Sequence, residues 1–174
     1  LPFAVPLPHV DRLQIRIDGA FGDWEYVTGV NDTLNAGINQ NVDLVAYKML
    51  SDTFNLYFYM SVAGTAFGDY AGDTARIFID TDQDASTGYS IMGLGADYEI
   101  RVFGHAGTVE SSSCLRFDNS RPQNDFNGFF SYCPSVPHTS ATLEDNEMFE
   151  VRVSLDSIDM AATQPVSAVF YMAD

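Results

Sequence analysis

Three aspartates with a spacing suited to cation binding follow the apolar run Ile77–Ile79. They are Asp80, Asp82 and Asp84, and Asp97 stands just before the next apolar run. Carboxylates at alternate positions can surround one cation where the backbone curls, because Ca²⁺ takes six to eight oxygen ligands at about 2.4 Å. The pattern predicts a Ca²⁺ site formed by Asp80, Asp82 and Asp84, or some of them, together with Asp97.

This acidic segment does not match an EF-hand. The sixth position of the segment is Ala85, where that loop needs Gly, and the twelfth is Ile91, where it needs Glu. A solvated acidic hairpin loop without a metal is the alternative interpretation.

The charge of the whole chain narrows the choice of partners. The 174 residues include 8 Lys and Arg against 24 Asp and Glu, which gives a net charge of −16. Nucleic acid and anionic lipid both require clustered cationic side chains, so neither is expected as a partner. Of the acids, 18 are Asp and 6 are Glu. Asp favours turns and cation-binding loops, whereas Glu favours helices.

The cysteines and the start of the sequence favour export from the cell. Cys114 and Cys133 flank a polar segment without a CxxC or HxxxH zinc pattern, and one disulfide is expected, with two buried thiols as the alternative. The sequence begins at Leu1 rather than Met and has no apolar run long enough to span a membrane, which fits a secreted or cell-surface protein after signal removal. Asn31 lies in a sequon and could carry a glycan.

Signatures of catalysis are missing from the sequence. There is no GxSxG nucleophile turn and no GxxxxGK phosphate loop, and His9, His105 and His138 lie in separate segments. The protein is therefore predicted not to be an enzyme.

The elements that would position the acidic loop are predicted to be strands. Long helical periodicity is absent, and Leu155–Met160 allows one helical turn at most. Apolar or alternating runs separated by Gly, Asn and Asp predict strands at Leu13–Ile17, Val42–Leu50, Phe54–Val62, Ala75–Ile79, Tyr98–Phe103, Thr108–Phe117, Phe129–Cys133, Phe149–Ser154 and Val166–Met172. This pattern predicts an all-β fold, a single antiparallel β-sandwich of the jelly-roll type.

The first residues differ from the rest and predict an extended arm over residues 1–12, followed by the sandwich domain over 13–174. Leu1, Phe3, Val5 and Leu7 alternate with three prolines and an alanine, so that one face of an extended segment is apolar. The prolines restrict main-chain pairing to one side. The arm is expected either to dock at a sheet edge of its own subunit or to add as a strand to a neighbouring subunit.

Several motifs, taken in order along the chain, resemble a known group of β-sandwiches. They are Ile17-Asp18-Gly19 with Asp23-Trp24, Leu56-Tyr57-Phe58 after Asp52, Ile77 to Gly88 with Gly95-Ala96-Asp97-Tyr98, and Phe149 to Leu155. Together they resemble modules similar to family 9 carbohydrate-binding modules, within the wider DOMON-like group. The resemblance implies a non-catalytic extracellular β-sandwich, often with bound calcium.

The resemblance also implies where a ligand would be held. Relatives that bind carbohydrate clamp a sugar between aromatic rings, commonly of tryptophan. Trp24 is the only Trp here and falls where the group uses a core residue, so stacking would depend on tyrosines such as Tyr47, Tyr70, Tyr89 or Tyr132. Other relatives hold haem through Met and His or Lys, for which Met49, Met60, His105 and His138 are the available residues.

Two functions follow from these observations. The first is a secreted, calcium-binding structural subunit that assembles with copies of itself into a filament, tube or surface layer, with the arm residues Leu1, Phe3, Val5 and Leu7 inserted into the next subunit. The alternative is a calcium-stabilised carbohydrate-binding module, whose partner would be a polysaccharide.

Overall fold

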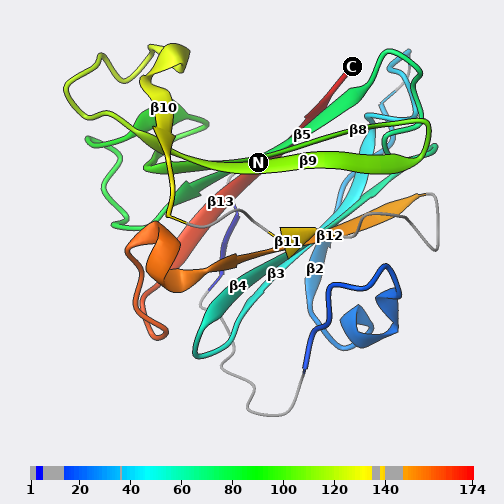
Figure 1. The fold of residues 1–174 in the computed structure, drawn as a ribbon, viewed down its shortest axis with the longest axis horizontal. Coiled ribbons are helices and arrows are strands. Elements are labelled where there is room, and N and C mark those ends of the chain that lie inside the picture. The colour runs from blue at the N-terminus through cyan, green and yellow to red at the C-terminus, as the bar shows by residue number, and fades with distance from the viewer. Residues whose placement is uncertain (1–2, 6–13, 36, 135–137, 140–146) are drawn as a thin grey trace.

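Two antiparallel sheets packed face to face make up the protein (Figure 1). The computed structural model describes residues 3–5, 14–35, 37–134, 138–139 and 147–174. The strands of the larger sheet are, in spatial order, β1 (Phe3–Val5), β13 (Val166–Ala173), β5 (Asp73–Asp80), β8 (Tyr98–His105), β9 (Thr108–Phe117) and β10 (Phe129–Tyr132). Those of the smaller sheet are β11 (His138–Thr139), β12 (Met148–Ser154), β4 (Asn55–Val62), β3 (Leu44–Ser51) and β2 (Gly29–Asn31). A separate hairpin consists of β6 (Tyr89–Ile91) and β7 (Leu94–Ala96).

The antiparallel β-sandwich predicted from the sequence is confirmed. Most of the long strands lie within two residues of their predicted bounds, and β9 has the bounds that were predicted. No α-helix occurs in the described part of the chain, which contains three short 3₁₀ helices: η1 (Phe21–Trp24), η2 (Phe126–Gly128) and η3 (Leu155–Ile158). No helix among the described residues has the length and apolar character needed to cross a bilayer.

The main core lies between the two sheets and follows the alternation of their strands. On β5, Ala75, Ile77 and Ile79 face the core, whereas Arg76 and Phe78 face the outside of the larger sheet. This division follows from the two-residue period of a strand. The outer face of the larger sheet is therefore available for the site described below.

A second, smaller core covers the outside of the smaller sheet. Trp24, brought there by η1, is 1% exposed and packs with Ile15, Tyr57 and Tyr59. The ring centroids of Trp24 and Tyr59 are 5.6 Å apart. Because both of its faces are covered, β4 is buried along nearly all its length.

The N-terminal segment differs from its prediction in part. A strand was predicted at Leu13–Ile17. The structure describes Gln14 to Ile17 of this segment, and they form no strand, although Ile15 is buried. Their alternation reflects the packing of Ile15, and in part Ile17, on the small core rather than ladder pairing. Gly29–Asn31, for which no strand was predicted, pairs with β3 as β2.

The predicted arm is described only at Phe3–Val5, which forms β1 and pairs antiparallel with β13 of its own chain, Phe3 opposite Ala168 and Val5 opposite Val166. Leu1 and Leu7 lie outside the described residues. This pairing agrees with the first of the two expectations for the arm, that it docks at a sheet edge of its own subunit. Assembly with a neighbouring chain stays a prediction.

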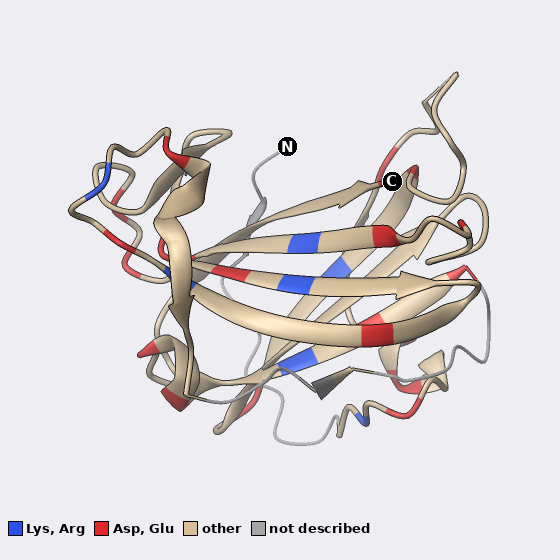
Figure 2. Ribbon diagram, turned by 45° about the horizontal axis from the view of Figure 1, so that its top comes forward, with Lys and Arg blue, Asp and Glu red and all other residues tan. Residues whose placement is uncertain are grey.

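Charge is distributed unevenly over the fold. Most acidic residues lie in loops and at strand ends, whereas several of the few cationic residues lie within strands (Figure 2). Asn31, the predicted glycan acceptor, is exposed at the end of β2, and its glycosylation stays a prediction.

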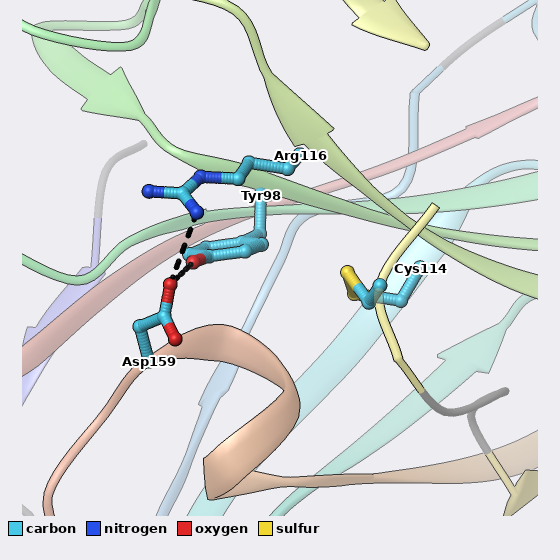
Figure 3. Close-up of a disulfide and its surroundings, with 5 residues drawn as sticks. Tyr98, Cys114, Arg116 and Asp159 are labelled. Atoms are coloured by element: carbon cyan, nitrogen blue, oxygen red, sulfur yellow. Dashed lines mark hydrogen bonds and ion pairs between the residues drawn. A yellow bond between two sulfur atoms is a disulfide. The ribbon is translucent and has the colours of Figure 1, made fainter. Parts of the chain in front are cut away.

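The predicted disulfide joins Cys114 on β9 to Cys133 just after β10, with a Cα–Cα distance of 5.4 Å (Figure 3). Cys133 also donates its backbone N–H to the carbonyl of Cys114 at 3.0 Å. Nearby, Arg116 and the hydroxyl of Tyr98 both contact Asp159, at 3.2 and 2.9 Å.

Candidate functional site

Three of the four aspartates predicted to bind calcium meet at one end of β5. Asp80 ends that strand, Asp82 follows in the loop, and Asp97 lies between β7 and β8. One carboxylate oxygen from each lies within 4.8 Å of the other two. Asp80 is buried, Asp97 is half-buried and Asp82 is exposed, so the cluster opens to solvent on one side.

Hydrogen bonds hold these carboxylates in place. Asp97 Oδ2 accepts from the backbone N–H and the hydroxyl of Thr81, at 2.9 and 2.8 Å. Asp80 Oδ1 accepts from the backbone N–H of Gln83 at 2.7 Å. Burial raises the pKa of Asp80, and the nearby charges of Asp97 and Asp82 add to that effect. A divalent cation would offset the repulsion that these charges produce.

Asp84, the fourth predicted ligand, lies outside this group. Its Oδ1 accepts from the backbone N–H and hydroxyl of Ser86, and these hydrogen bonds lower the pKa of Asp84. Its backbone N–H donates to Asp82 Oδ1 at 2.9 Å, so Asp84 shapes the loop instead.

The acidic loop packs tightly against the β6–β7 hairpin. A Cβ atom at Gly95 on β7 would collide with the carbonyl oxygens of Thr87 and Asp84. Glycine at this position lets the two segments approach each other. The geometry of the acidic cluster and the position of the hairpin are therefore coupled.

A groove of about 370 Å³ lies beside this hairpin on the outer face of the larger sheet. Its lining comes from β5, β6, η2 and β13 and consists of Arg76, Phe78, Tyr89, Ile91, Phe126, Tyr171 and Ala173. The volume is within the range of small-molecule sites, about 300–1,000 Å³. Tyr171 is half exposed, and the rings of Tyr89 and Phe126 contact each other with centroids 5.6 Å apart.

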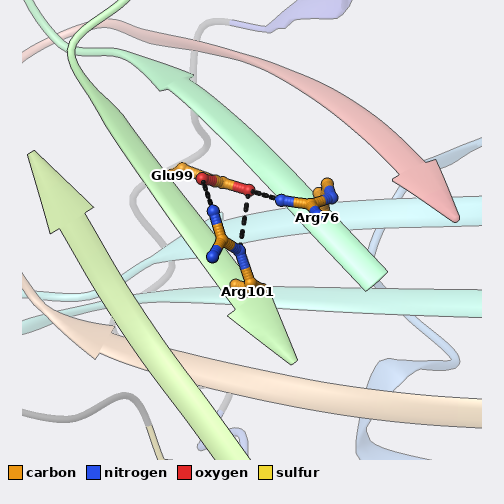
Figure 4. A network of polar contacts seen from close by, with 3 residues as sticks. All are labelled: Arg76, Glu99 and Arg101. Atoms are coloured by element: carbon orange, nitrogen blue, oxygen red, sulfur yellow. Dashed lines mark hydrogen bonds and ion pairs between the residues drawn. The ribbon is translucent and has the colours of Figure 1, made fainter. Parts of the chain in front are cut away.

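The floor of the groove continues into a network of charged side chains (Figure 4). Buried Glu99 on β8 pairs with Arg76 and accepts from Arg101 Nη2 at 2.7 Å. The register places Tyr171, Arg76 and Arg101 opposite one another on three adjacent strands. The guanidinium of Arg76 also lies over the ring of Phe126, 5.0 Å from its centroid. Arg76 is thereby fixed from two sides.

Of the tyrosines considered for stacking, only Tyr89 lines this groove. Tyr47, one of the four tyrosines considered, is buried in the main core against Phe170 and is not available for stacking on a sugar. Tyr70 and Tyr132 are exposed but do not line it. Tyr171, which also lines the groove, was not predicted, although its alternation with core residues on the last strand is a signal for the outer face.

Of the residues considered for haem, Met49, Met60 and His105 lie in different surroundings, and the side chain of His138 is outside the part of the structure that is described. Met49 and Met60 are buried in the main core. His105 lies at the end of β8 and pairs with Glu110, with 2.7 Å between Nε2 and Oε1.

The fold is similar to that of a solved carbohydrate-binding protein. The structure of a family 9 carbohydrate-binding module from Caldicellulosiruptor kristjanssonii in complex with cellotriose aligns over 91% of this chain and 80% of that chain, with a TM-score of 0.50 and 15% sequence identity. No known protein-family model matches the sequence, and no curated protein matches it. The likeness shows that the chain shares the β-sandwich fold of that module.

Proposed function

We propose that the protein is a non-catalytic carbohydrate-binding module and that the groove beside the β6–β7 hairpin is its binding site. The observation that carries the proposal is the row of Tyr171, Arg76 and Arg101 on the outer sheet face, next to the rings of Tyr89 and Phe126. The similarity in fold to a module solved with cellotriose supports the same function.

The chemistry of the groove suits a sugar. The C–H face of a pyranose is apolar and packs on an aromatic ring, while its hydroxyls need fixed hydrogen-bonding partners. Tyr171 offers a half-exposed ring, and Arg76 and Arg101 offer guanidinium N–H groups held by Glu99. Because Glu99 orients both arginines before the ligand arrives, binding loses less side-chain entropy.

Calcium in the acidic cluster would support this site indirectly. The cluster of Asp80, Asp82 and Asp97 flanks the β6–β7 hairpin, which carries Tyr89 and Ile91 into the groove. A Ca²⁺ ion there would fix the hairpin and hence one wall of the groove.

The test is calorimetric titration with cellotriose and with a panel of soluble polysaccharides. Tyr171→Ala is expected to weaken the binding of the best ligand at least tenfold. Tyr26→Ala, an exposed tyrosine outside the groove, is the matched control and is expected to bind like the wild type. Failure of the wild-type protein to bind any polysaccharide would contradict the function, and unchanged binding by Tyr171→Ala would contradict the site.

Self-assembly into a secreted structural polymer is the second candidate, supported by one observation. β1 lies at the outer edge of the larger sheet, where only three described residues pair with β13. A short edge strand is easily replaced, and the same strand of a neighbouring subunit could occupy the edge with the same register.

Negative-stain microscopy of the purified protein with and without Ca²⁺ tests this candidate. Filaments, tubes or layers are expected for the full chain and none after deletion of residues 1–8, while sugar binding by the truncated protein stays intact. Monomers of the full chain under every condition would rule the polymer out.

A further inference from the structure

The outer face of the larger sheet carries two arginines for one carboxylate. Arg76 and Arg101 are directly opposite each other on β5 and β8, a placement of like charges that destabilises a sheet. Both pair with buried Glu99, and in the part of the chain that the structure describes neither has another ion pair (Figure 4). This place therefore holds more positive charge than its own carboxylate compensates, in a chain whose net charge is −16.

The two guanidinium groups keep N–H donors that Glu99 does not use. A guanidinium has five such donors in one plane. Arg76 donates to Glu99 through Nη1, and Arg101 donates through Nε and Nη2, at 3.3 and 2.7 Å. Neither donates to any other described residue, so more than half of the donors of each remain for a ligand. The side chains of Arg76 and Arg101 are 22% and 34% exposed, which leaves both within reach.

These free donors lie next to the aromatic part of the groove. The row on β13, β5 and β8 runs from Tyr171 through Arg76 to Arg101. Because neighbouring strands are about 4.8 Å apart, Arg101 lies about 10 Å from Tyr171 across the sheet. A saccharide stacked on the half-exposed ring of Tyr171 would thus place its neighbouring substituents beside the two guanidinium groups.

We propose that the groove selects a saccharide with a carboxylate, that is, a uronic acid unit, and that Arg76 and Arg101 bind this carboxylate. The inference rests on the proposed carbohydrate-binding function and specifies its substrate class. A planar guanidinium matches the two oxygens of a carboxylate, and hydrogen bonds between charged groups are stronger than those between neutral ones. A neutral saccharide could occupy the same donors with hydroxyl oxygens, but it would leave the surplus positive charge uncompensated.

Acids on either side of the row limit the charge that the ligand can carry. Asp80 ends β5 and belongs to the acidic cluster, whose three carboxylates exceed the charge of one divalent cation. At the other end, Asp174 follows Ala173 of the groove lining. A polyanionic chain would meet like charge beyond the arginines. The groove therefore suits a mainly neutral polysaccharide with isolated uronic acid units rather than a polyuronate.

The test is calorimetric titration of the wild-type protein with matched oligosaccharides built on glucan, xylan and galactan backbones. Each backbone is supplied in a neutral form, with one uronic acid unit, and with the methyl ester of that acid, which keeps the shape and removes the charge. At least one acid is expected to bind about tenfold or more tightly than its ester. Sodium chloride should reduce this preference, because it screens the charges.

The outcomes separate this inference from the proposed function. Binding of the oligosaccharides with equal affinity for acid and ester on every backbone would overturn the inference and leave the carbohydrate-binding function standing. Binding of none of them, acid or neutral, would contradict the function itself. Tighter binding of polygalacturonate than of every oligosaccharide with one acid would overturn the limit to isolated uronic acid units.

Arg101→Gln tests the origin of the preference. Glu99 keeps Arg76 as its partner in this variant, and the ratio of acid to ester affinity is expected to fall towards one. Arg16→Gln removes the same charge from an exposed position on the segment that covers the smaller sheet, and it is expected to keep the wild-type ratio. An unchanged ratio in Arg101→Gln, or an equal fall in both variants, would contradict the role of the arginine pair. The comparison of acid with ester needs only the wild type, so it stands if Arg101→Gln does not fold.

Discussion

Glu150 shows how one buried side chain can organise distant parts of a fold. It lies on β12, is fully buried, and accepts hydrogen bonds from the backbone N–H groups of Asp18 and Gly19 and from Trp24 Nε1, all at 2.8–2.9 Å. Burial raises its pKa, although these three hydrogen bonds act in the opposite direction. The contact explains why the Ile17-Asp18-Gly19 and Asp23-Trp24 motifs occur together with the late Phe149–Leu155 segment.

Replacing Glu150 tests this role at the level of one residue. Glu150→Gln keeps the shape but turns one acceptor into a donor that faces other donors, so we expect the free energy of unfolding to fall by about 1–3 kcal/mol. Chemical denaturation followed by circular dichroism measures the loss. Glu147→Gln, an exposed neighbour, serves as the control and should be close to neutral. An equal loss of unfolding free energy in the two variants would contradict a stabilising role for the buried hydrogen bonds of Glu150.

Asp52 and Tyr57 provide a pH-dependent contribution to stability. Asp52 accepts from the backbone N–H groups of Phe54 and Asn55 and from the Tyr57 hydroxyl, each at 2.7 Å. Burial acts to raise the pKa of Asp52, but these hydrogen bonds outweigh it and hold the pKa below its ordinary value of 3.8. Burial, followed by the contact with Asp52, raises the pKa of Tyr57 from 10.0 to about 12.

The signs of these two shifts define a pH window. The stabilisation from Asp52 is present above its unfolded pKa and is lost as the pH falls through the folded pKa. The stabilisation from Tyr57 is complete below pH 10.0 and is lost as the pH rises towards about 12. Absorbance titration of tyrosine ionisation should show one late-ionising group shift to lower pH in Asp52→Asn but not in Asp156→Asn. An unchanged titration curve would count against the pairing.

At the scale of elements, the disulfide secures the edge of the larger sheet. It connects β9 with the end of β10 across a sequence separation of 19 residues. We expect the Cys114→Ser/Cys133→Ser double variant to lose about 2–4 kcal/mol of stability, mainly because the unfolded chain gains freedom. Thermal melts of the variant and of the wild type with and without reductant measure this. A reductant effect that persists in the variant would assign the loss to another cause.

The strands were predictable because alternation and turn residues are local signals. Thr108–Phe117 and the apolar runs around Ile77 and Phe58 specify their own conformation through the faces that they bury. Gln14–Ile17 carries the same alternation yet forms no strand, because its place depends on tertiary contacts. Ile15 packs with Trp24, and the residues that follow, Asp18 and Gly19, bond to Glu150, which is distant in sequence. β2 has no apolar pattern and pairs only because β3 offers a free edge.

The candidate sites were predictable only in part for the same reason. Asp80 and Asp82 are close in sequence, and Asp97 returns to them through a hairpin, so their grouping could be anticipated. The row of Tyr171, Arg76 and Arg101 depends on strand order and register, which no local pattern reveals.

For the whole molecule, the net charge of −16 has a structural consequence. Acids of like charge are concentrated at both ends of β5, around Asp80 and around Asp73. Without a divalent cation at Asp80, Asp82 and Asp97, repulsion should loosen that end of the sandwich.

We therefore expect chelator to lower the melting temperature of the wild-type protein and millimolar Ca²⁺ to restore it. Sodium chloride at matched ionic strength should restore much less, because screening does not replace coordination. Differential scanning calorimetry measures the shifts. A melting temperature that responds equally to the two salts would reduce the calcium dependence to simple screening.

The position of Trp24 has a practical consequence for spectroscopy. As the only Trp, it gives an emission signal that reports on the small core outside the five-stranded sheet and not on the core between the sheets. Detachment of η1 from β4 and β12 would shift that emission to longer wavelength while the circular dichroism of the strands stayed unchanged. Fluorescence and circular dichroism thus follow different parts of this molecule, and a gap between their transitions would identify the N-terminal cover as a separate unfolding unit.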